Sequence, residues 1–246
     1  MLNSIPKAGT HLLIRILSLV DVLSPRWKSH ITRHTPSTCD QLSHIHRGQF
    51  ISAHLMWREE YRSILQTNNI KTLFIIRDLR DLSVSKMFFS KKIGPKLGGR
   101  FYDYHKHIDS DEERLTAVIA GVDADSMPDG IRYISVGERA RSFLPWMHAP
   151  GCLTVRFEDL IGHAGGGSDE QQLETVRAII QHLGLTYSDE QITRIASQAF
   201  FQKAKTFRKG QIGDWSNHFT EEQKRIFKQV AGAELIEMGY ADGYDW

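Results

Sequence analysis

The sequence predicts an α/β fold: a single domain in which a central parallel sheet is flanked by helices. Three short apolar runs rich in strand-forming residues each end just before a polar cluster, at Phe50–Ala53, Thr72–Ile76 and Cys152–Phe157. Helical patterns lie between these runs, and strands that alternate with helices form parallel sheets. The length of 246 residues suits one such domain with its own core.

The helices are indicated by periodicity and by capping residues. A short strand at the start of the chain leads into an apolar helix over Thr10–Leu23. Thr220 and Gln223 fit a capping box for the last helix. The other predicted helices are Arg58–Gln66, Asp81–Ser90, Gly137–His148, Asp169–Leu183 and one that begins at Ser188. The segment Lys91–Asp129 is rich in glycine and charge and is predicted to be an irregular lid or acceptor loop within the domain 1–246.

Composition limits the function classes. Hydrophobic residues make up 41% and charged residues 24%, as in soluble globular proteins. A formal net charge of only +2 argues against a broad nucleic-acid footprint. The apolar stretch Leu12–Leu23 is interrupted by Arg15 and Asp21, so neither a transmembrane segment nor a signal peptide is expected.

Cysteine and histidine usage gives two further expectations. Cys39 and Cys152 cannot make a disulfide framework, so a reduced, cytoplasmic protein is expected. Twelve histidines are present, several of them between His30 and His54, but none has zinc-ligand spacing with the cysteines. No metal is therefore predicted.

The segment Ile5–His11 has the features of a phosphate cradle. Gly9 permits close backbone approach to a ligand, and the amides of Gly9, Thr10 and His11 would point out of a helix N-terminus. Lys7 adds a positive charge, and it precedes the glycine, unlike the lysine of a Walker motif. The alternative is an ordinary strand–turn–helix corner with a solvated lysine.

Two further clusters could bind anions. Arg77 ends the strand Thr72–Ile76, and Ser85 lies two turns into the next helix, so the two side chains suit a second phosphate. Alternatively, Arg77 pairs with Asp78 or Asp81. The segment Phe207–Trp215 carries the adjacent cations Arg208 and Lys209 before Gly210, and is predicted to be a mobile basic flap or a solvated charge pair.

Together these segments resemble the sulfotransferases that use 3′-phosphoadenosine-5′-phosphosulfate (PAPS). Pro6 to Thr10 resembles their P-K-(S/T)-G-T loop for the 5′-phosphosulfate, and Arg77, Asp81 and Ser85 match their R-x-x-x-D-x-x-x-S site for the 3′-phosphate. Arg208 to Thr220 resembles R-K-G-x-x-G-D-W-x-N-x-F-T, and Arg156 to Leu160 resembles (R/Y)-Y-E-D-(L/M). The resemblance implies a P-loop-like sulfotransferase fold and PAPS as co-substrate, without a metal.

The resemblance also implies roles for individual residues. The nucleotide site comprises Lys7, Ala8, Gly9, Thr10, His11, Leu12, Arg77, Ser85, Phe157, Arg208, Lys209 and Gly210. His54 matches the catalytic histidine of the family's K-T-H-L segment and, with an ordinary pKa near 6.5, would be the general base. Lys7 would contact the bridging oxygen as that oxygen gains charge. The alternative is that His54 is one of many surface histidines.

Four positions depart from the family pattern. Ala8 replaces a loop serine, Leu12 a common tryptophan, Phe157 a tyrosine, and Ser52 the lysine of the histidine segment. Ala8 and Ser52 favour an alternative, a catalytically degenerate nucleotide-binding protein. A small P-loop kinase is the other alternative; it would need a Walker lysine and magnesium.

The expected acceptor is a small molecule, a sugar or a lipid headgroup, sulfated on a hydroxyl or an amine. Tyr102, Tyr104, His105 and His107 give the predicted lid aromatic, hydrogen-bonding surface that suits any of these acceptors.

Overall fold

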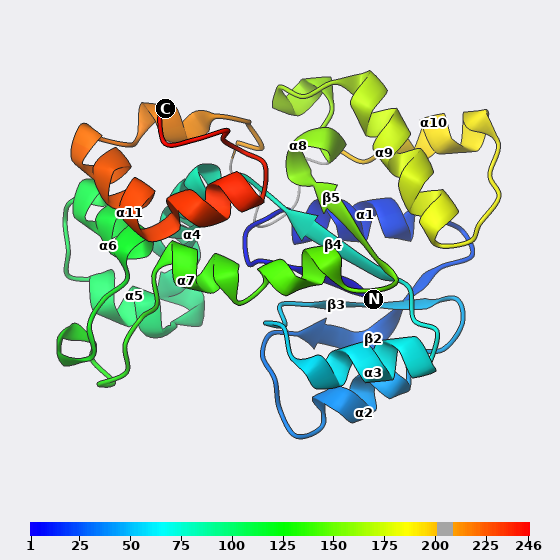
Figure 1. The fold of residues 1–246 in the computed structure, drawn as a ribbon, viewed down its shortest axis with the longest axis horizontal. Coiled ribbons are helices and arrows are strands. Elements are labelled where there is room, and N and C mark those ends of the chain that lie inside the picture. Colours follow the sequence, from blue (N-terminus) through cyan, green and yellow to red (C-terminus); the bar gives the residue numbers. More distant parts are fainter. Residues whose placement is uncertain (201–208) are drawn as a thin grey trace. The chain divides into compact units, whose positions relative to one another are not determined.

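The computed structural model describes residues 1–200 and 209–246, and for residues 26–29 the backbone alone. In this part of the chain, five strands form one sheet in the order β2-β3-β1-β4-β5, and every neighbouring pair is parallel (Figure 1). The strands are β1 (Leu2–Ser4), β2 (Ser24–Ile31), β3 (Gln49–Ala53), β4 (Thr72–Ile76) and β5 (Cys152–Arg156). The predicted α/β fold with a central parallel sheet is therefore confirmed.

Helices connect the strands and continue beyond the last one. The α-helices are α1 (Thr10–Ser18), α2 (Thr38–Ser43), α3 (Glu59–Thr67), α4 (Leu79–Leu97), α5 (Arg100–His105), α6 (Asp111–Ala120), α7 (Val136–Arg141), α8 (Phe157–Leu160), α9 (Asp169–His182), α10 (Asp189–Ser197) and α11 (Glu221–Glu237). Short 3₁₀ helices are η1 (Ala124–Ser126), η2 (Leu144–His148), η3 (His163–Gly165) and η4 (Asp214–Asn217). In the described residues, none of the helices is both long and apolar enough to cross a membrane.

The chain divides into two compact units, each made of two stretches of sequence. The first comprises Met1–Arg77 and Phe143–Ile212, and the second comprises Asp78–Ser142 and Gly213–Trp246. All five strands belong to the first unit, together with α1, α2, α3, α8, α9 and α10. The second unit is helical and contains α4, α5, α6, α7 and α11.

Both faces of the sheet in the first unit are covered. On one face, Leu73 and Ile75 of β4 belong to an apolar cluster with residues of α1, α8, α9 and α10. On the other face, Phe74 stacks on Phe143 with ring centroids 6.5 Å apart. Because successive side chains of a strand point to opposite faces, β4 can be apolar at every position, as its uninterrupted burial shows.

Helices α7 and α11 of the second unit pack closely at a glycine and are joined by an ion pair. At Gly137 of α7, an added Cβ would lie 1.7 Å from the carbonyl oxygen of Val230 in α11, so only glycine fits there. Arg141 of α7 donates to Glu234 of α11 at 2.8 Å, and Glu234 is buried. α7 begins with a capping box formed by Ser135 and Glu138.

Several predicted elements form where expected. Thr72–Ile76 is β4, Phe50–Ala53 lies within β3, and α9 covers the predicted Asp169–Leu183 to within one residue. Ser188 and Thr220 each cap a helix with a reciprocal capping box. β5 ends at Arg156, one residue before its predicted end, because Phe157 is the first residue of α8.

Two predicted helices are shorter than expected. The predicted helix Thr10–Leu23 ends at Ser18, and its last residues form a turn that leads into β2, a strand that the pattern did not indicate. The predicted helix Gly137–His148 is divided after Arg141, because Pro145 lacks the amide that a continuing α-helix needs and a 3₁₀ turn begins at Leu144 instead.

The prediction that Lys91–Asp129 is irregular was wrong. α4 continues to Leu97, and α5 and α6 both form within the segment. The Ser110 side chain caps α6 and accepts the Glu113 amide, and three acidic residues occupy the first turn, where the helix dipole favours them. Leu115 and Ile119 of α6 are buried. The proposed use of this region as a lid stays a prediction.

Candidate functional site

The loop from β1 to α1 has the geometry of an anion cradle. Lys7 has a φ of 81° and Gly9 a φ of 106°, so two of its residues adopt the left-handed region. Gly9 is the N-cap of the nine-residue α1 and has no side chain to accept a hydrogen bond from the first-turn amides. The amides of Thr10 and His11 therefore lie at a helix N-terminus that favours a negatively charged ligand.

Gly9 is required by its neighbours as well as by its φ. An added Cβ would lie 2.6 Å from Phe157 Cδ2 and 3.1 Å from Ile75 Cδ1. The guanidinium of Arg77 lies over the ring of Phe157, 4.2 Å from its centroid. The same guanidinium donates to the carbonyl of Gln211 at 3.1 Å. The structure thus brings together three of the predicted site residues: Gly9, Phe157 and Arg77.

Other predicted nucleotide contacts differ in exposure. Ala8 is fully buried, and Thr10 is nearly so. His11 is exposed, whereas Leu12 is half-buried and packs on the apolar cluster under α1. Leu12 could therefore contact the adenine of a bound nucleotide only through the part of its side chain that is not packed on the core.

His54 follows β3, and its ring is held in one tautomer. Its Nδ1 lies 3.0 Å from the carbonyl oxygen of Ser4, at the end of the adjacent strand β1. A carbonyl oxygen only accepts hydrogen bonds, so Nδ1 carries the hydrogen and Nε2 carries the lone pair. The backbone is fixed on both sides: the His54 amide donates to Ile31 at 2.8 Å, and Leu55 exchanges two 2.9 Å hydrogen bonds with the Asn3 side chain.

The basicity of His54 is weaker than the sequence suggested. The pKa of His54 is lowered to about 4, chiefly by burial and also by the charges of His30, His11 and Lys7, while the hydrogen bond to Ser4 acts to raise it. The expected ordinary pKa near 6.5 is therefore corrected. A pKa of about 4 keeps the imidazole neutral at physiological pH, so Nε2 is available to accept a proton.

Although His11 is exposed as a residue, partial desolvation of its ring lowers its pKa, with Lys7 and His30 as further causes, and burial lowers the pKa of His30. These mutual effects show that Lys7, His11, His30 and His54 share one electrostatic environment. An anion bound among these groups would favour the protonated form of each histidine and raise its pKa.

His30 and Ser4 are two residues of this site that the sequence reasoning missed. The rings of His30 and His54 meet edge to face with centroids 4.7 Å apart, and His30 Nδ1 lies 2.8 Å from Ser52 Oγ. The register of β2 against β3 shifts between Pro25 and His30, and after this shift His30 pairs with Ser52. The signal available in the sequence was the group of histidines between His30 and His54, of which His54 alone was predicted to belong to the site.

Part of the predicted basic flap can be placed. Arg208 lies outside the described residues, Lys209 is exposed, and Gly210 has a φ of 61°. The chain after it packs beside η3, because the Ile212 amide donates to the Gly165 carbonyl at 3.2 Å. Ser85 is half-buried in α4 and belongs to the second unit, so its joint use with Arg77 stays a prediction.

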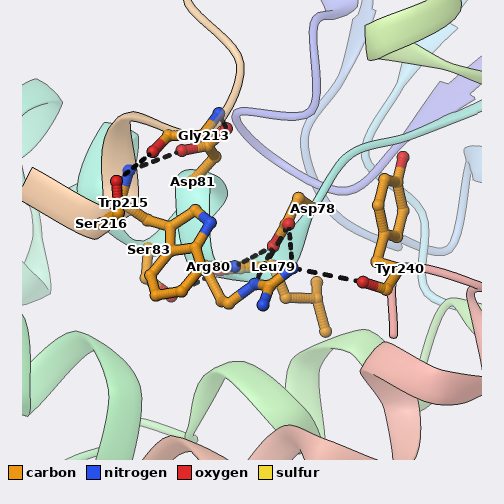
Figure 2. A network of polar contacts seen from close by, with 9 residues as sticks. All are labelled: Asp78, Leu79, Arg80, Asp81, Ser83, Gly213, Trp215, Ser216 and Tyr240. Atoms are coloured by element: carbon orange, nitrogen blue, oxygen red, sulfur yellow. Dashed lines mark hydrogen bonds and ion pairs between the residues drawn. The ribbon is translucent and has the colours of Figure 1, made fainter. Parts of the chain in front are cut away.

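Asp78 and Asp81 have structural partners in the second unit (Figure 2). Asp78 caps α4 and pairs with Arg80 at 2.7 Å, and the Arg80 guanidinium also donates to the Tyr240 carbonyl at 3.2 Å. Asp81 is buried and accepts the amides of Gly213 and Trp215 at 2.8 and 2.9 Å. The carboxylate of Asp81 therefore fixes the start of η4, just beyond the basic segment.

Replacing Asp81 should destabilise the second unit. Asp81→Asn keeps the size of the side chain, but its amide can accept through one oxygen only and faces a backbone donor with an NH₂ group. We expect a loss of about 2 kcal/mol in the free energy of unfolding, the order for hydrogen bonds to a buried charge. Urea denaturation of both proteins measures this, with Asp125→Asn, at an exposed position, as the control. An unchanged midpoint for Asp81→Asn would contradict the anchoring role.

Within residues 1–200 and 209–246, histidines, cysteines and carboxylates do not gather in groups of three that could hold a metal ion.

Comparison with known proteins finds relatives over nearly the whole chain. A family model described as "Sulfotransferase domain" matches residues 1–239. Sulfotransferase 2A2 of Rattus norvegicus is 24% identical over 253 residues, covering 92% of this chain and 80% of its own length. Sulfotransferase 2A1 of Homo sapiens is 23% identical over 261 residues, covering 95% and 82%.

Solved structures show the same fold. Mouse sulfotransferase SULT7A1 complexed with PAP superimposes with a TM-score of 0.66 at 20% identity, over 95% of this chain and 83% of that one. Retinol dehydratase in complex with androsterone and inactive cofactor PAP gives a TM-score of 0.62 at 14% identity, over 95% and 79%.

Proposed function

Because the chain belongs to the sulfotransferase family, we propose that it transfers a sulfuryl group from PAPS to a hydroxyl or amine of a small-molecule, sugar or lipid acceptor. The observation that carries the proposal is the 3.0 Å contact of His54 Nδ1 with the Ser4 carbonyl, from which it follows that Nε2 carries the lone pair of a base. The two solved neighbours were crystallised with PAP, which supports the same class of nucleotide here.

In this proposal, the β1–α1 loop binds the 5′-phosphosulfate. The amides at the N-terminus of α1 and the hydroxyl of Thr10 donate to its oxygens, as backbone donors do at other helix N-termini that bind phosphate. Lys7 places an ammonium beside the oxygen that bridges phosphorus and sulfur. Because that oxygen gains charge as its bond to sulfur breaks, the cation stabilises the transition state more than the bound substrate.

His54 acts on the acceptor in the same step. The acceptor oxygen or nitrogen forms its bond to sulfur, the bond from sulfur to the bridging oxygen breaks, and the acceptor proton moves to Nε2 of His54. Burial keeps His54 neutral before the step, so no proton has to leave it first. The remaining contribution is in-line positioning of the two reactants.

The 3′-phosphate is assigned to Arg77 and Ser85, with Arg208, Lys209 and Gly210 as further contacts. Arg77 is buried, and its guanidinium is already oriented by the Phe157 ring and the Gln211 carbonyl. A guanidinium held in this way loses little freedom when it binds a phosphate. Phe157 is 5% exposed, so it supports Arg77 and Gly9 more than it offers a face to the adenine.

The proposal also includes a cellular compartment and a reaction that needs no metal. The expected compartment is the cytoplasm, since Cys39 and Cys152 are both free thiols. No metal is needed by the chemistry, because the charge on the leaving phosphate is met by Lys7 and the α1 amides.

Nucleotide binding tests the proposal. The desulfonated product PAP should stabilise the fold in the presence of EDTA, by about 2.7 kcal/mol at a hundredfold excess over Kd. AMP, which lacks the 3′-phosphate, should give a clearly smaller thermal shift at the same concentration. Equal shifts from PAP and AMP would contradict the two-phosphate site. Binding of PAP with no turnover of PAPS on a broad panel of acceptors would instead identify a nucleotide-binding protein without catalytic activity.

A further inference from the structure

The side chain of Ser4 contacts both the proposed base and the proposed phosphate loop. It is the last residue of β1 and is fully buried. Its Oγ lies 3.0 Å from His54 Nδ1 and 2.7 Å from Thr10 Oγ1. Ser4 was not among the residues that the sequence indicated for the site.

The directions of these hydrogen bonds follow from one another. The Ser4 carbonyl requires the hydrogen on His54 Nδ1, and the same N–H faces Ser4 Oγ, which therefore accepts. The Ser4 hydroxyl is then free to donate to Thr10 Oγ1. Thr10 in turn keeps its own hydroxyl hydrogen for another acceptor, such as an oxygen of the phosphosulfate. The reverse direction would place the lone pair of Nδ1 against the lone pairs of a carbonyl oxygen.

We propose that Ser4 is a positioning residue that couples the phosphate loop to the base, through a chain of hydrogen bonds directed from His54 to Thr10. This inference rests on the proposed function. When a proton arrives at Nε2, the ring becomes positive and its Nδ1–H becomes a stronger donor to Ser4. The next bonds of the chain strengthen in the same direction. As a result, the Thr10 hydroxyl becomes a stronger hydrogen-bond donor to the phosphosulfate while the bridging oxygen gains negative charge.

The same hydrogen bonds also transmit an effect from the phosphate loop to His54. Anion binding at Thr10 polarises the Ser4 hydroxyl and makes its oxygen a better acceptor for Nδ1–H. The ring of His54 is then held more firmly with Nε2 toward the acceptor. Nucleotide binding at the β1–α1 loop and the orientation of His54 are thereby linked, although the loop follows β1 and His54 follows β3.

Three variants test this coupling. Ser4→Ala removes the hydroxyl and keeps the carbonyl, Ser4→Thr keeps both, and Ser83→Ala removes a fully buried hydroxyl that bonds only within its own helix in the described contacts. Ser4→Ala should lower kcat about tenfold, the order expected for one buried hydrogen bond, with little change in the Kd for PAP. Ser4→Thr and Ser83→Ala should stay within about twofold of the wild type.

The second readout is the ¹⁵N NMR signal of the His54 ring. Adding PAP should shift the Nδ1 resonance of His54 in the wild type, and the shift should be largely lost in Ser4→Ala. A Ser4→Ala protein with wild-type kcat, or with the full PAP-induced shift, would overturn the coupling while leaving the proposed function intact. A wild-type protein that shows no thermal shift with PAP would overturn the proposed function and this inference with it.

Discussion

His54→Ala is expected to lower kcat by roughly 10²–10⁴, the range for loss of a positioned general base. The Kd for PAP should stay nearly unchanged, because in the proposed mechanism Nε2 of His54 contacts the acceptor and not the phosphates. Calorimetry with PAP and initial rates with one working acceptor measure the two effects on the same preparations. His46→Ala, which removes an exposed histidine, is the matched control.

Wild-type turnover in His54→Ala would contradict the role of the base. A parallel loss of PAP affinity would show instead that the residue supports the β1–α1 loop. The pKa gives an independent check: in the nucleotide-free protein, NMR titration of His54 should show a midpoint near 4. Because a lowered pKa means that the neutral form persists into acid, the base should stay competent through the pH range in which an ordinary histidine becomes protonated. A midpoint near 6.5 would contradict the buried setting.

The second large effect concerns Arg77. Arg77→Ala should weaken PAP binding about 10–100-fold, the order for losing hydrogen bonds to a charged group. Binding of the 3′-dephospho nucleotide AMP should weaken far less, because a guanidinium–phosphate pair forms only where the phosphate exists. The quantity to compare is therefore the ratio of the two Kd values, before and after the substitution.

The ratio of the two Kd values distinguishes a role of Arg77 in binding the 3′-phosphate from a role in stabilising the fold. Arg77 also contacts the Phe157 ring and the Gln211 carbonyl, so its removal will lower stability somewhat, and that loss would affect both nucleotides alike. Arg62→Ala, at an exposed arginine of α3, controls for the change in net charge. Equal weakening of PAP and AMP by Arg77→Ala would assign the residue a structural role only.

Local signals predicted much of the fold and of the phosphate loop. The β1–α1 loop could be predicted because a glycine at a helix start and a neighbouring lysine are recognisable without knowledge of the rest of the chain. The capping box predicted at Thr220 involves residues only three positions apart, and it forms; the helix start predicted at Ser188 also forms, with a capping box of its own. β4 could be recognised as a buried strand from its continuous apolar run.

Features that depend on distant segments could not be predicted in this way. β2 contains Pro25 and several polar residues, and it forms because β3 supplies its hydrogen-bond partners. The low pKa of His54 results from burial, and its tautomer from Ser4, which lies 50 positions away. The helices in Lys91–Asp129 were missed because glycine and charge hid their apolar positions, whose burial depends on α11 and α4.

The register shift in β2 has a consequence for solubility. Among the described strands, β2 lies at one end of the sheet, where backbone amides and carbonyls face no further strand. Such an edge can add a strand from another molecule and so begin aggregation. Pro25 lacks an amide hydrogen to offer, and the register shift between Pro25 and His30 interrupts the even spacing that an added strand would need. The irregularity that sets His30 beside Ser52 therefore also discourages chains from joining edge to edge.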